Sequence, residues 1–420
     1  MSHIDRGQKI ISGHIHMKEA TGLSKLFSIF LALLPVIAIY SSGIPGFNLA
    51  DIIIMLFLAA SVVMGSNKRY RIDSRLLFIL LFCVYICTMP LLIGAVSENT
   101  VFSDVIIRTI RILFYIISAA FLARRHLDTA TFKKTVVRVS LLGVAFVLLQ
   151  YVLYNLFDYY LVGYLPFLEV YQAGYEGVDY VSRFETQFFR PTSFFLEPAH
   201  CSRYLIIGLI LVLFKRKMRR RDYIIAIMIA IGILLTTSGQ GYIMVAIVFL
   251  CFVFFNPYKV VSTRKIGRIL GFLSLAAIVF VVLYFSTDII QNTFSRIFND
   301  TSTGAVSARL GTLFEILDED VLYLIFGHGY GAVPYENAWT SGITYVLYGS
   351  GFIGLLILLI FFSKSIFSKK TVNKITALVF LFLFFTDDAF NSYMTVIYLS
   401  TILYYMEDVR ENRFIYRHRD

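Results

Sequence analysis

Long apolar runs separated by short polar segments dominate the chain from residue 25 to residue 406. A helix needs about 17–25 mainly apolar residues to cross a bilayer, and most of the runs reach that length. The pattern predicts an all-α fold: a polytopic membrane helix bundle of about 12 transmembrane helices. The expected spans are 25–43, 49–65, 76–95, 105–123, 136–157, 198–214, 223–239, 241–256, 269–286, 341–362, 375–386 and 389–406. The eleventh is the shortest, so the last two are expected as two half-deep helices or as one longer pair.

The composition supports this reading. The 420 residues are 58% hydrophobic and only 15% charged, with a mean hydropathy of +0.74. Soluble chains average about 45–50% apolar and about 25% charged residues. A soluble enzyme, a nucleic-acid-binding domain and a disordered scaffold are therefore excluded. We expect residues 1–420 to form one transmembrane domain.

The basic residues lie almost entirely on one side of the predicted spans. With the N-terminus inside, 31 of the 38 Lys and Arg residues fall in inner segments, and both termini are cytoplasmic. The net charge of +11 then reflects topology and attraction to anionic membrane lipids rather than a nucleic-acid partner. All 14 lysines are inside, so the seven outward cations are all arginines. Arginine suits bidentate binding of phosphate or carboxylate, although chance also allows this distribution.

Two outward segments are long enough to carry a site, namely residues 158–197 and 287–340. Connections longer than about 12–15 residues are usually functional or disordered. Both segments contain aromatic residues, glycines and arginines rather than a low-complexity tract. We therefore expect two ordered, functional extracytoplasmic loops.

The first long loop ends in a group that could bind an anion. Pro198 suits the first position of a helix, which places Glu197 at the positive end of the sixth span and Arg203 within its first two turns. We expect Arg190 and the backbone N–H groups at this helix end to bind a lipid-linked phosphate. The alternative is structural: Glu197 balances the helix dipole and pairs with Arg190.

The second long loop carries Arg309, a glycine-rich stretch at 324–331 and the sequence Glu336-Asn337-Ala338-Trp339. The alternating glycines allow a backbone nest for an anion, although the stretch matches no nucleotide-binding motif. His328 and Glu336 are candidate proton acceptors. A hydrogen-bonded loop histidine and an interfacial Trp339 are the structural alternatives. Residues 318–320 are expected to be a solvated acidic turn, and no metal site is expected.

Polar residues also occur within or between the spans. Arg108 and Arg111 share one face of the fourth span, and an arginine as deep as Arg111 is costly unless it faces a polar cavity or partner. We expect both to line the site. Ser238, in a tight outward turn at residues 236–241, is a candidate ligand for sugar or phosphate, or part of a plain hairpin.

In their order and placement, these motifs resemble the O-antigen polymerase and ligase superfamily, which comprises Wzy-type polymerases and WaaL-type ligases. The resemblance rests on the stretch from Arg190 to Glu197-Pro198, the hydroxyl-rich turn at 236–241, Ser307-Ala308-Arg309 followed by Phe326-Gly327-His328-Gly329, and Glu336-Asn337 before a glycine-rich span. It covers about residues 190–360. Gln240 stands near where the family often has Ser-Arg-Gly. Ligases often have a histidine near the position of Glu336, which favours a polymerase.

The resemblance implies a GT-C-like fold in the bacterial cytoplasmic membrane and a glycosyltransferase that uses neither a cofactor nor a metal. The glycan would pass from undecaprenyl diphosphate to the hydroxyl of a lipid-linked repeat unit on the outer face. Arg190 and Arg309 would be catalytic, and Arg203 and Asn337 would bind the substrate. A chain-length regulator and a flippase of the same pathway are candidate partners. The alternatives are a ligase and, in another class, a lipid-linked oligosaccharide flippase.

Overall fold

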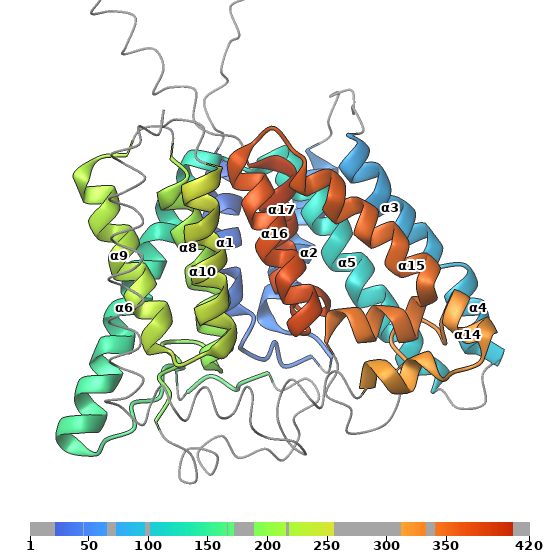
Figure 1. The fold of residues 1–420 in the computed structure, drawn as a ribbon, viewed down its shortest axis with the longest axis horizontal. Helices are drawn as coiled ribbons and strands as arrows, with labels where there is room; N and C mark the ends of the chain where they lie inside the picture. The colour runs from blue at the N-terminus through green and yellow to red at the C-terminus, as the bar shows by residue number, and fades with distance from the viewer. Residues whose placement is uncertain are drawn as a thin grey trace, which may run out of the picture.

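The structure is a computed structural model, and it describes residues 22–44, 46–64, 73–96, 101–165, 167–171, 189–215, 218–255, 312–332 and 341–405. These residues form a bundle of helices that run up and down beside one another (Figure 1). The described part of the chain contains no strand, only the isolated bridges Tyr40–Val170 and Ser41–Asn48. The predicted all-α membrane bundle is therefore confirmed.

Eleven of the twelve predicted spans coincide with helices, and the ninth, 269–286, lies outside the described residues. The helices are α1 (Gly22–Ile37), α2 (Leu49–Val63), α3 (Ser74–Ile86), α4 (Met89–Val96), α5 (Phe102–His126), α6 (Thr129–Phe157), α8 (Pro198–Leu213), α9 (Arg220–Leu235), α10 (Gly239–Phe254), α14 (Val321–Phe326), α15 (Gly342–Ile366), α16 (Thr371–Thr386), the 3₁₀ turn η1 (Ala389–Asn391) and α17 (Met394–Tyr404).

Four helical segments are both long and apolar enough to cross a bilayer: 74–96, 102–126, 129–157 and 342–366. Six further apolar helices are shorter, and α8 shows how such a helix fits the bundle. Every residue from Cys201 to Leu213 is buried, so α8 is apolar all round and forms the core. α6, α9, α10 and α16 surround it.

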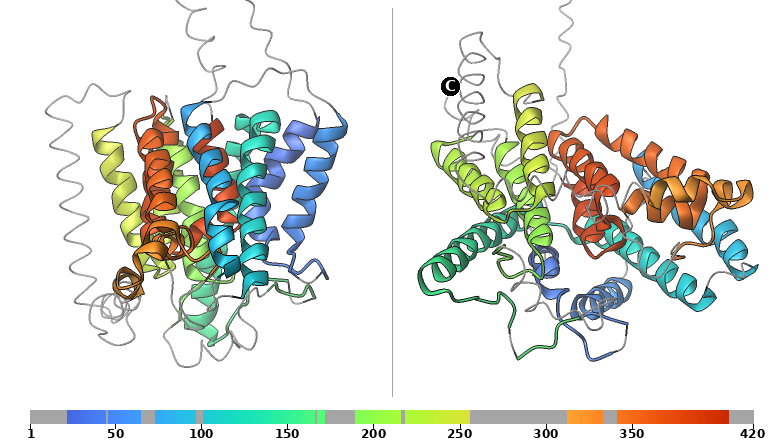
Figure 2. Two further views of the ribbon diagram at one scale, coloured as in Figure 1. Left: turned by 90° about the vertical axis from the view of Figure 1, so that its right-hand side faces the viewer. Right: turned by 60° about the horizontal axis from the view of Figure 1, so that its bottom comes forward.

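Two spans are broken close to the segment 325–331, and the connection between two others also lies there. The third span divides into α3 and α4 at Cys87-Thr88, and α15 bends at Gly351, where the backbone leaves helical geometry. The last two spans are separated by η1, as the shortness of 375–386 indicated. In Figure 2 (right), α14 and the start of α15 lie beside α4. Non-helical backbone within a membrane is tolerated only where it is buried in protein or lines a polar cavity. The breaks therefore indicate that this part of the bundle is enclosed by protein or faces such a cavity.

The breaks are held by specific polar contacts. The Tyr85 hydroxyl donates to the carbonyl oxygens of Phe326 (3.2 Å) and Ser350 (3.1 Å), which ties α3 to the end of α14 and to α15 just before its bend. The Asp387 carbonyl accepts from the N–H of Gly342 at 2.8 Å and so joins the end of α16 to the start of α15. Backbone groups freed by the breaks are thus satisfied within the protein.

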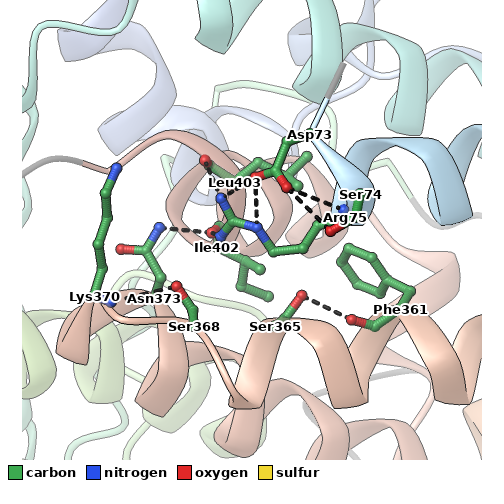
Figure 3. Close-up of polar contacts among 10 residues, drawn as sticks. All are labelled: Asp73, Ser74, Arg75, Phe361, Ser365, Ser368, Lys370, Asn373, Ile402 and Leu403. Carbon is green, nitrogen blue, oxygen red and sulfur yellow. Dashed lines mark hydrogen bonds and ion pairs between the residues drawn. The ribbon is translucent and has the colours of Figure 1, made fainter. Parts of the chain in front are cut away.

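At the opposite end of the bundle, side chains cap the C-terminus of α17 (Figure 3). Arg75 donates to the carbonyl oxygens of Ile402 (2.8 Å) and Leu403 (3.4 Å), and Asn373 donates to Ile402 at 2.7 Å. Asp73 pairs with Arg75 at 2.5 Å. α17 is therefore fixed at this end by α3 and α16, while its other end adjoins η1.

The bend in α15 gives a stability test at Gly351. Its φ of +63° is in the left-handed region, and an added Cβ would collide with the Ile325 carbonyl. We expect Gly351→Ala to lower the free energy of unfolding by at least about 3 kcal/mol, because a strained φ and a clash add together. The measurement is thermal unfolding of the protein purified in detergent.

Gly43→Ala is the matched control for that variant. Its φ is +76°, but an added Cβ there meets nothing within 4 Å. It should cost only the backbone term of about 1–2 kcal/mol. Equal unfolding temperatures for the two variants would contradict the role given to the contact between α15 and Ile325.

Candidate functional site at one end of the bundle

Arg190 from the first long loop lies against the turn between α9 and α10. Its Nε donates to Thr237 Oγ1 at 3.3 Å and its Nη2 to the Thr237 carbonyl at 3.5 Å. The chain after Arg190 is held by Gln150 of α6, whose Oε1 accepts from the Ser193 N–H at 2.8 Å. The predicted hairpin at 236–241 is present, because α9 ends at Leu235 and α10 begins at Gly239.

The start of α8 is as the sequence predicts. Pro198 is in the first turn, and Glu197 is the N-cap residue with extended backbone. The Glu197 side chain makes no capping hydrogen bond, so its carboxylate does not compete for the N–H groups of the first turn. Glu197 interacts electrostatically with Arg203.

Arg203 forms a buried ion pair with Asp387, which follows the last residue of α16. Both side chains are nearly inaccessible, with relative exposures of 6% and 10%. The Asp387 Oδ1 atom also accepts from the N–H of Asp388 at 2.7 Å, and Tyr398 donates to the Arg203 carbonyl at 2.9 Å. A charge pair this deep is stable only with further hydrogen bonds. Asp387 has one, whereas Arg203 Nε is buried with no hydrogen-bond partner among the described residues.

Ser238 and Gln240 join the hairpin to the same region. Ser238 is the N-cap of α10, and its Oγ accepts from Ser202 Oγ of α8 at 3.3 Å. Gln240 Nε2 donates to the Thr386 carbonyl at 3.1 Å. The structure thus brings Arg190, Glu197, Arg203 and Ser238 together around the start of α8, next to the end of α16. This assembly is called the α8 group below.

Arg108 and Arg111 belong to a second assembly on α5. Arg108 Nη1 donates to the Gly331 carbonyl at 3.2 Å, and its side chain also interacts with Tyr345 of α15. Arg111 donates to the Gly46 carbonyl and to the Tyr171 hydroxyl, the latter at 2.9 Å. The expected polar partners of Arg111 therefore include the connection between α1 and α2.

The glycines at 327, 329 and 331 have a packing role. All three have positive φ, and a Cβ on each would press on a neighbouring element: on Gly349 and Ser350, on Val105 and Pro90, and on Arg108. The N–H groups of Gly327 and His328 are already used by the carbonyls of Tyr323 (2.7 Å) and Tyr348 (2.9 Å). This stretch therefore lets α4, α5 and α15 approach closely, and these two N–H groups are not available to an anion.

His328 lies between two tyrosine rings. Its ring is stacked on Tyr323 at 4.0 Å and on Tyr348 at 4.3 Å between centroids. Neither ring nitrogen has a hydrogen-bond partner among the described residues, and Nε2 is 3.5 Å from a Glu319 carboxylate oxygen. Burial lowers the pKa of His328, and the nearby Glu319 raises it, with burial the larger effect. The imidazole is therefore neutral at pH 7 and able to accept a proton.

The sequence analysis did not predict the polar cluster between α16 and α17. Asp388 Oδ1 accepts from Asn391 Nδ2 at 2.5 Å, and Tyr330 donates from its hydroxyl to Asn391. Thr109 of α5 donates to the Tyr330 carbonyl at 2.7 Å. Asp388 also interacts electrostatically with Arg203. Asp387-Asp388 therefore lies between the α8 group and the arginines of α5. The sequence did contain a sign of this cluster, because Asp387 and Asp388 are adjacent acids that interrupt an apolar stretch.

Several predicted site residues lie outside the described residues: Arg309, Glu336, Asn337 and Trp339. Their positions relative to the α8 group remain predictions. In the acidic turn at 318–320, Asp320 caps α14 and Glu319 approaches His328. Within the described ranges, no group of three or more His, Cys, Asp or Glu residues is placed to hold a metal ion.

The fold and site define a multi-pass membrane protein with Arg190 and Arg203 brought together at one end of its bundle. Residues 33–343 match the family model described as WcaD colanic acid polymerase. The match spans well over half of the chain, so the protein belongs to this family. It is a polysaccharide repeat-unit polymerase, a glycosyl-transferring enzyme that acts on lipid-linked oligosaccharides. No curated protein and no solved structure matches the chain.

The family match confirms the resemblance to Wzy-type polymerases that the motifs indicated. The GT-C-like character of the fold stays a prediction, as do the division into one domain with loops at 158–197 and 287–340 and the roles of the individual site residues.

The buried ion pair gives a test that separates folding from activity. We expect Asp387→Asn to lower the free energy of unfolding by about 3–5 kcal/mol, because it leaves the Arg203 charge buried without its partner. The double variant R203M/D387L replaces both charges with apolar side chains and should recover most of that stability. The measurement is again thermal unfolding in detergent.

The double variant should nevertheless lose polymer formation, if Arg203 acts on substrate. A double variant that is both stable and fully active would show that the pair has only a structural role.

Proposed function

We propose that this polymerase transfers a growing glycan from undecaprenyl diphosphate to a hydroxyl of a lipid-linked repeat unit, on the outer face of the bacterial cytoplasmic membrane. The observation that carries the proposal is the α8 group. It brings Arg190 from a loop and Arg203 from a buried helix to one end of the bundle, around the positive end of α8. Such an arrangement suits a diphosphate at the membrane surface.

The proposed chemistry is a displacement at the anomeric carbon of the donor. The bond between that carbon and the diphosphate oxygen breaks, and its electrons stay on the leaving diphosphate. The acceptor hydroxyl oxygen forms the new bond and loses its proton to a base. Arg190 and Arg309, aided by Arg203 and Arg111, would stabilise the charge that develops on the diphosphate. No metal is needed for that role, since fixed guanidinium groups supply the positive charge.

Glu336 or His328 would take the proton from the acceptor. His328 is a suitable base in its protonation state, because burial keeps its imidazole neutral. Its ring faces are covered by Tyr323 and Tyr348, and both ring nitrogens are buried, so His328 could act as the base only after these side chains move. Glu336 belongs to the motif that resembles the superfamily, and it is the alternative.

The charge distribution supports the orientation. The described lysines lie away from the α8 group: in the first turns of α1 and α6, directly after α8, and around the α15–α16 connection. By the positive-inside rule that end is cytoplasmic, with both termini inside and the α8 group outside. A flippase that delivers repeat units to the outer face and a chain-length regulator are the partners this scheme requires.

The arginine assignment predicts a complete loss of elongation. Arg190→Ala and Arg309→Ala should each reduce polymer by at least about 100-fold, because loss of one preorganised charge at the leaving group costs about 3 kcal/mol or more. Single repeat units should accumulate on the lipid carrier. The measurement is the length of lipid-linked glycan extracted from cells that carry each variant.

The control for both variants is Arg221→Ala, which removes an exposed arginine at the other end of the bundle. It should leave polymer length unchanged. Full elongation in both site variants would contradict the arginine assignment. Long chains on the carrier in a strain lacking the gene would indicate a ligase, and single units held on the inner face would indicate a flippase.

Metal independence is tested with purified protein and a lipid-linked repeat unit. We expect transfer to continue at an unchanged rate after dialysis against EDTA, because arginines balance the charge of the diphosphate. Added Mg²⁺ or Mn²⁺ should raise the rate less than about twofold, within the range of ionic-strength effects. Loss of transfer in EDTA and recovery with one divalent ion would contradict the arginine-only scheme.

A further inference from the structure

The end of α6 stands out from the rest of the bundle. α6 has 29 residues, which makes it about 43 Å long, against about 30 Å for the hydrocarbon core. Figure 1 shows its last turns projecting beyond the hairpin between α9 and α10. The residues that project are on the same end of the bundle as the α8 group.

Four aromatic rings gather at this projecting end. The Phe189 ring is stacked on Tyr154 with centroids 4.3 Å apart and an interplanar angle of 14°. Tyr151 and Tyr160 meet Phe189 edge to face, at 5.6 Å and 5.8 Å. Tyr154 and Tyr160 are 5.1 Å apart. Offset-stacked and edge-to-face aromatic pairs are each favourable, so these contacts fix the four rings relative to one another.

The segment that follows α6 is also fixed in place. Gln150 Nε2 donates to the Leu161 carbonyl at 2.8 Å, and Gly163 is so close to the Ser193 carbonyl that a Cβ would collide with it. Farther along, the Tyr171 N–H donates to the Ile39 carbonyl at 2.8 Å. The chain therefore crosses this end of the bundle from α6 to the connection between α1 and α2.

The segment that forms this region, residues 151–171, contains many aromatic residues and no Lys or Arg. Tyr159 is 56% exposed and Tyr160 is 37% exposed. No Lys or Arg occurs between Arg138 and Arg183, and Asp158 and Glu169 lie in the segment. Within the described residues of the segment itself, no cation is present to bind a phosphate or an anionic lipid headgroup. The apolar C–H face of a sugar ring, however, packs well on the electron-rich face of a tyrosine.

The aromatic cluster adjoins Arg190, and this position suggests which ligand the cluster binds. Phe189 is the residue directly before Arg190, so the aromatic cluster begins where the proposed diphosphate site ends. In the donor, the first sugar is bonded to the diphosphate, and the rest of the chain extends away from it. A diphosphate at Arg190 therefore puts sugars within reach of the cluster formed by Tyr151, Tyr154, Tyr160 and Phe189.

We propose that this cluster, with Tyr159, is a glycan-binding platform that holds the uncharged part of the growing polysaccharide during elongation. The inference rests on the proposed function and adds a second kind of contact to it. The arginines bind the diphosphate, and the tyrosines bind the sugars next to it. A platform of this kind raises the number of repeat units added before the chain dissociates.

The competing role for exposed tyrosines is a membrane anchor, because tyrosine is enriched at bilayer interfaces. The two roles differ in what a substitution changes. A platform affects the length of the polymer, whereas an anchor affects the amount and stability of the protein in the membrane.

The test compares Y159A/Y160A with Y159F/Y160F, which keeps both rings, and with Tyr223→Ala, which removes a 38% exposed tyrosine at the start of α9. Y159A/Y160A should shorten the mean polymer about five- to tenfold, the change expected for about 1–1.4 kcal/mol of lost binding. This loss should exceed any fall in the initial rate. The phenylalanine variant should give near-normal lengths, and Tyr223→Ala normal lengths.

A second measurement addresses binding directly. The probe is the strain's own polysaccharide, depolymerised to short oligomers and titrated onto purified protein in detergent. Wild-type protein should bind the oligomers, and Y159A/Y160A should bind them about five- to tenfold more weakly.

Unchanged polymer length and unchanged oligomer binding in Y159A/Y160A would overturn the platform. So would a fall in membrane-inserted protein that accounts for the whole effect, since this is the result expected of an anchor. Absence of polymer from wild-type protein would instead overturn the proposed polymerisation, and the platform with it. Arg190→Ala should abolish polymer at any length, which keeps the two sites distinguishable.

Discussion

A buried charge inside a membrane bundle needs an opposite charge from the protein itself, and the pair of Arg203 and Asp387 meets that constraint at the start of α8. Asp387 ends α16, and its carbonyl accepts from the start of α15, while Arg203 lies in the second turn of the central helix α8. One ion pair thus fixes three helices relative to one another. The interruption between α16 and α17 is possible because these contacts satisfy the groups that it exposes.

The same interruption connects the two sets of arginines. Asp387 faces the α8 group, and Asp388 with Asn391 leads through Tyr330 to α5, where Arg108 and Arg111 lie. The proposed reaction between two lipid-linked ligands would require two diphosphates to be held at once. Cations on both sides of one acidic segment suit that requirement, because the segment separates the like charges and neutralises part of each set. The capped far end of α17 keeps this segment in register with the bundle.

Hydropathy predicted the spans well, because the thickness of the bilayer dictates helix length along the chain. Local rules also predicted Pro198 at the start of α8 and the hairpin at 236–241, since both depend on neighbouring residues only. The partner of Arg203 could not be found this way, because Asp387 is 184 residues away in sequence. The glycines at 327–331 allowed two interpretations, an anion-binding nest or close packing of helices. The positions of α4, α5 and α15 are needed to choose between these interpretations.

A polymerase must bind its substrate tightly next to the bond that breaks and weakly along the rest of the chain. Charge interactions near a low-dielectric bundle are strong and localised, which suits the diphosphate but would trap a chain that has to advance. Aromatic contacts with sugar rings are individually weak and tolerant of position, so a polymer can shift by one repeat unit without leaving the surface. The proposed division between arginines at the α8 group and tyrosines at the end of α6 separates these two demands. Phe189 and Arg190, adjacent in the chain, lie on the boundary between them.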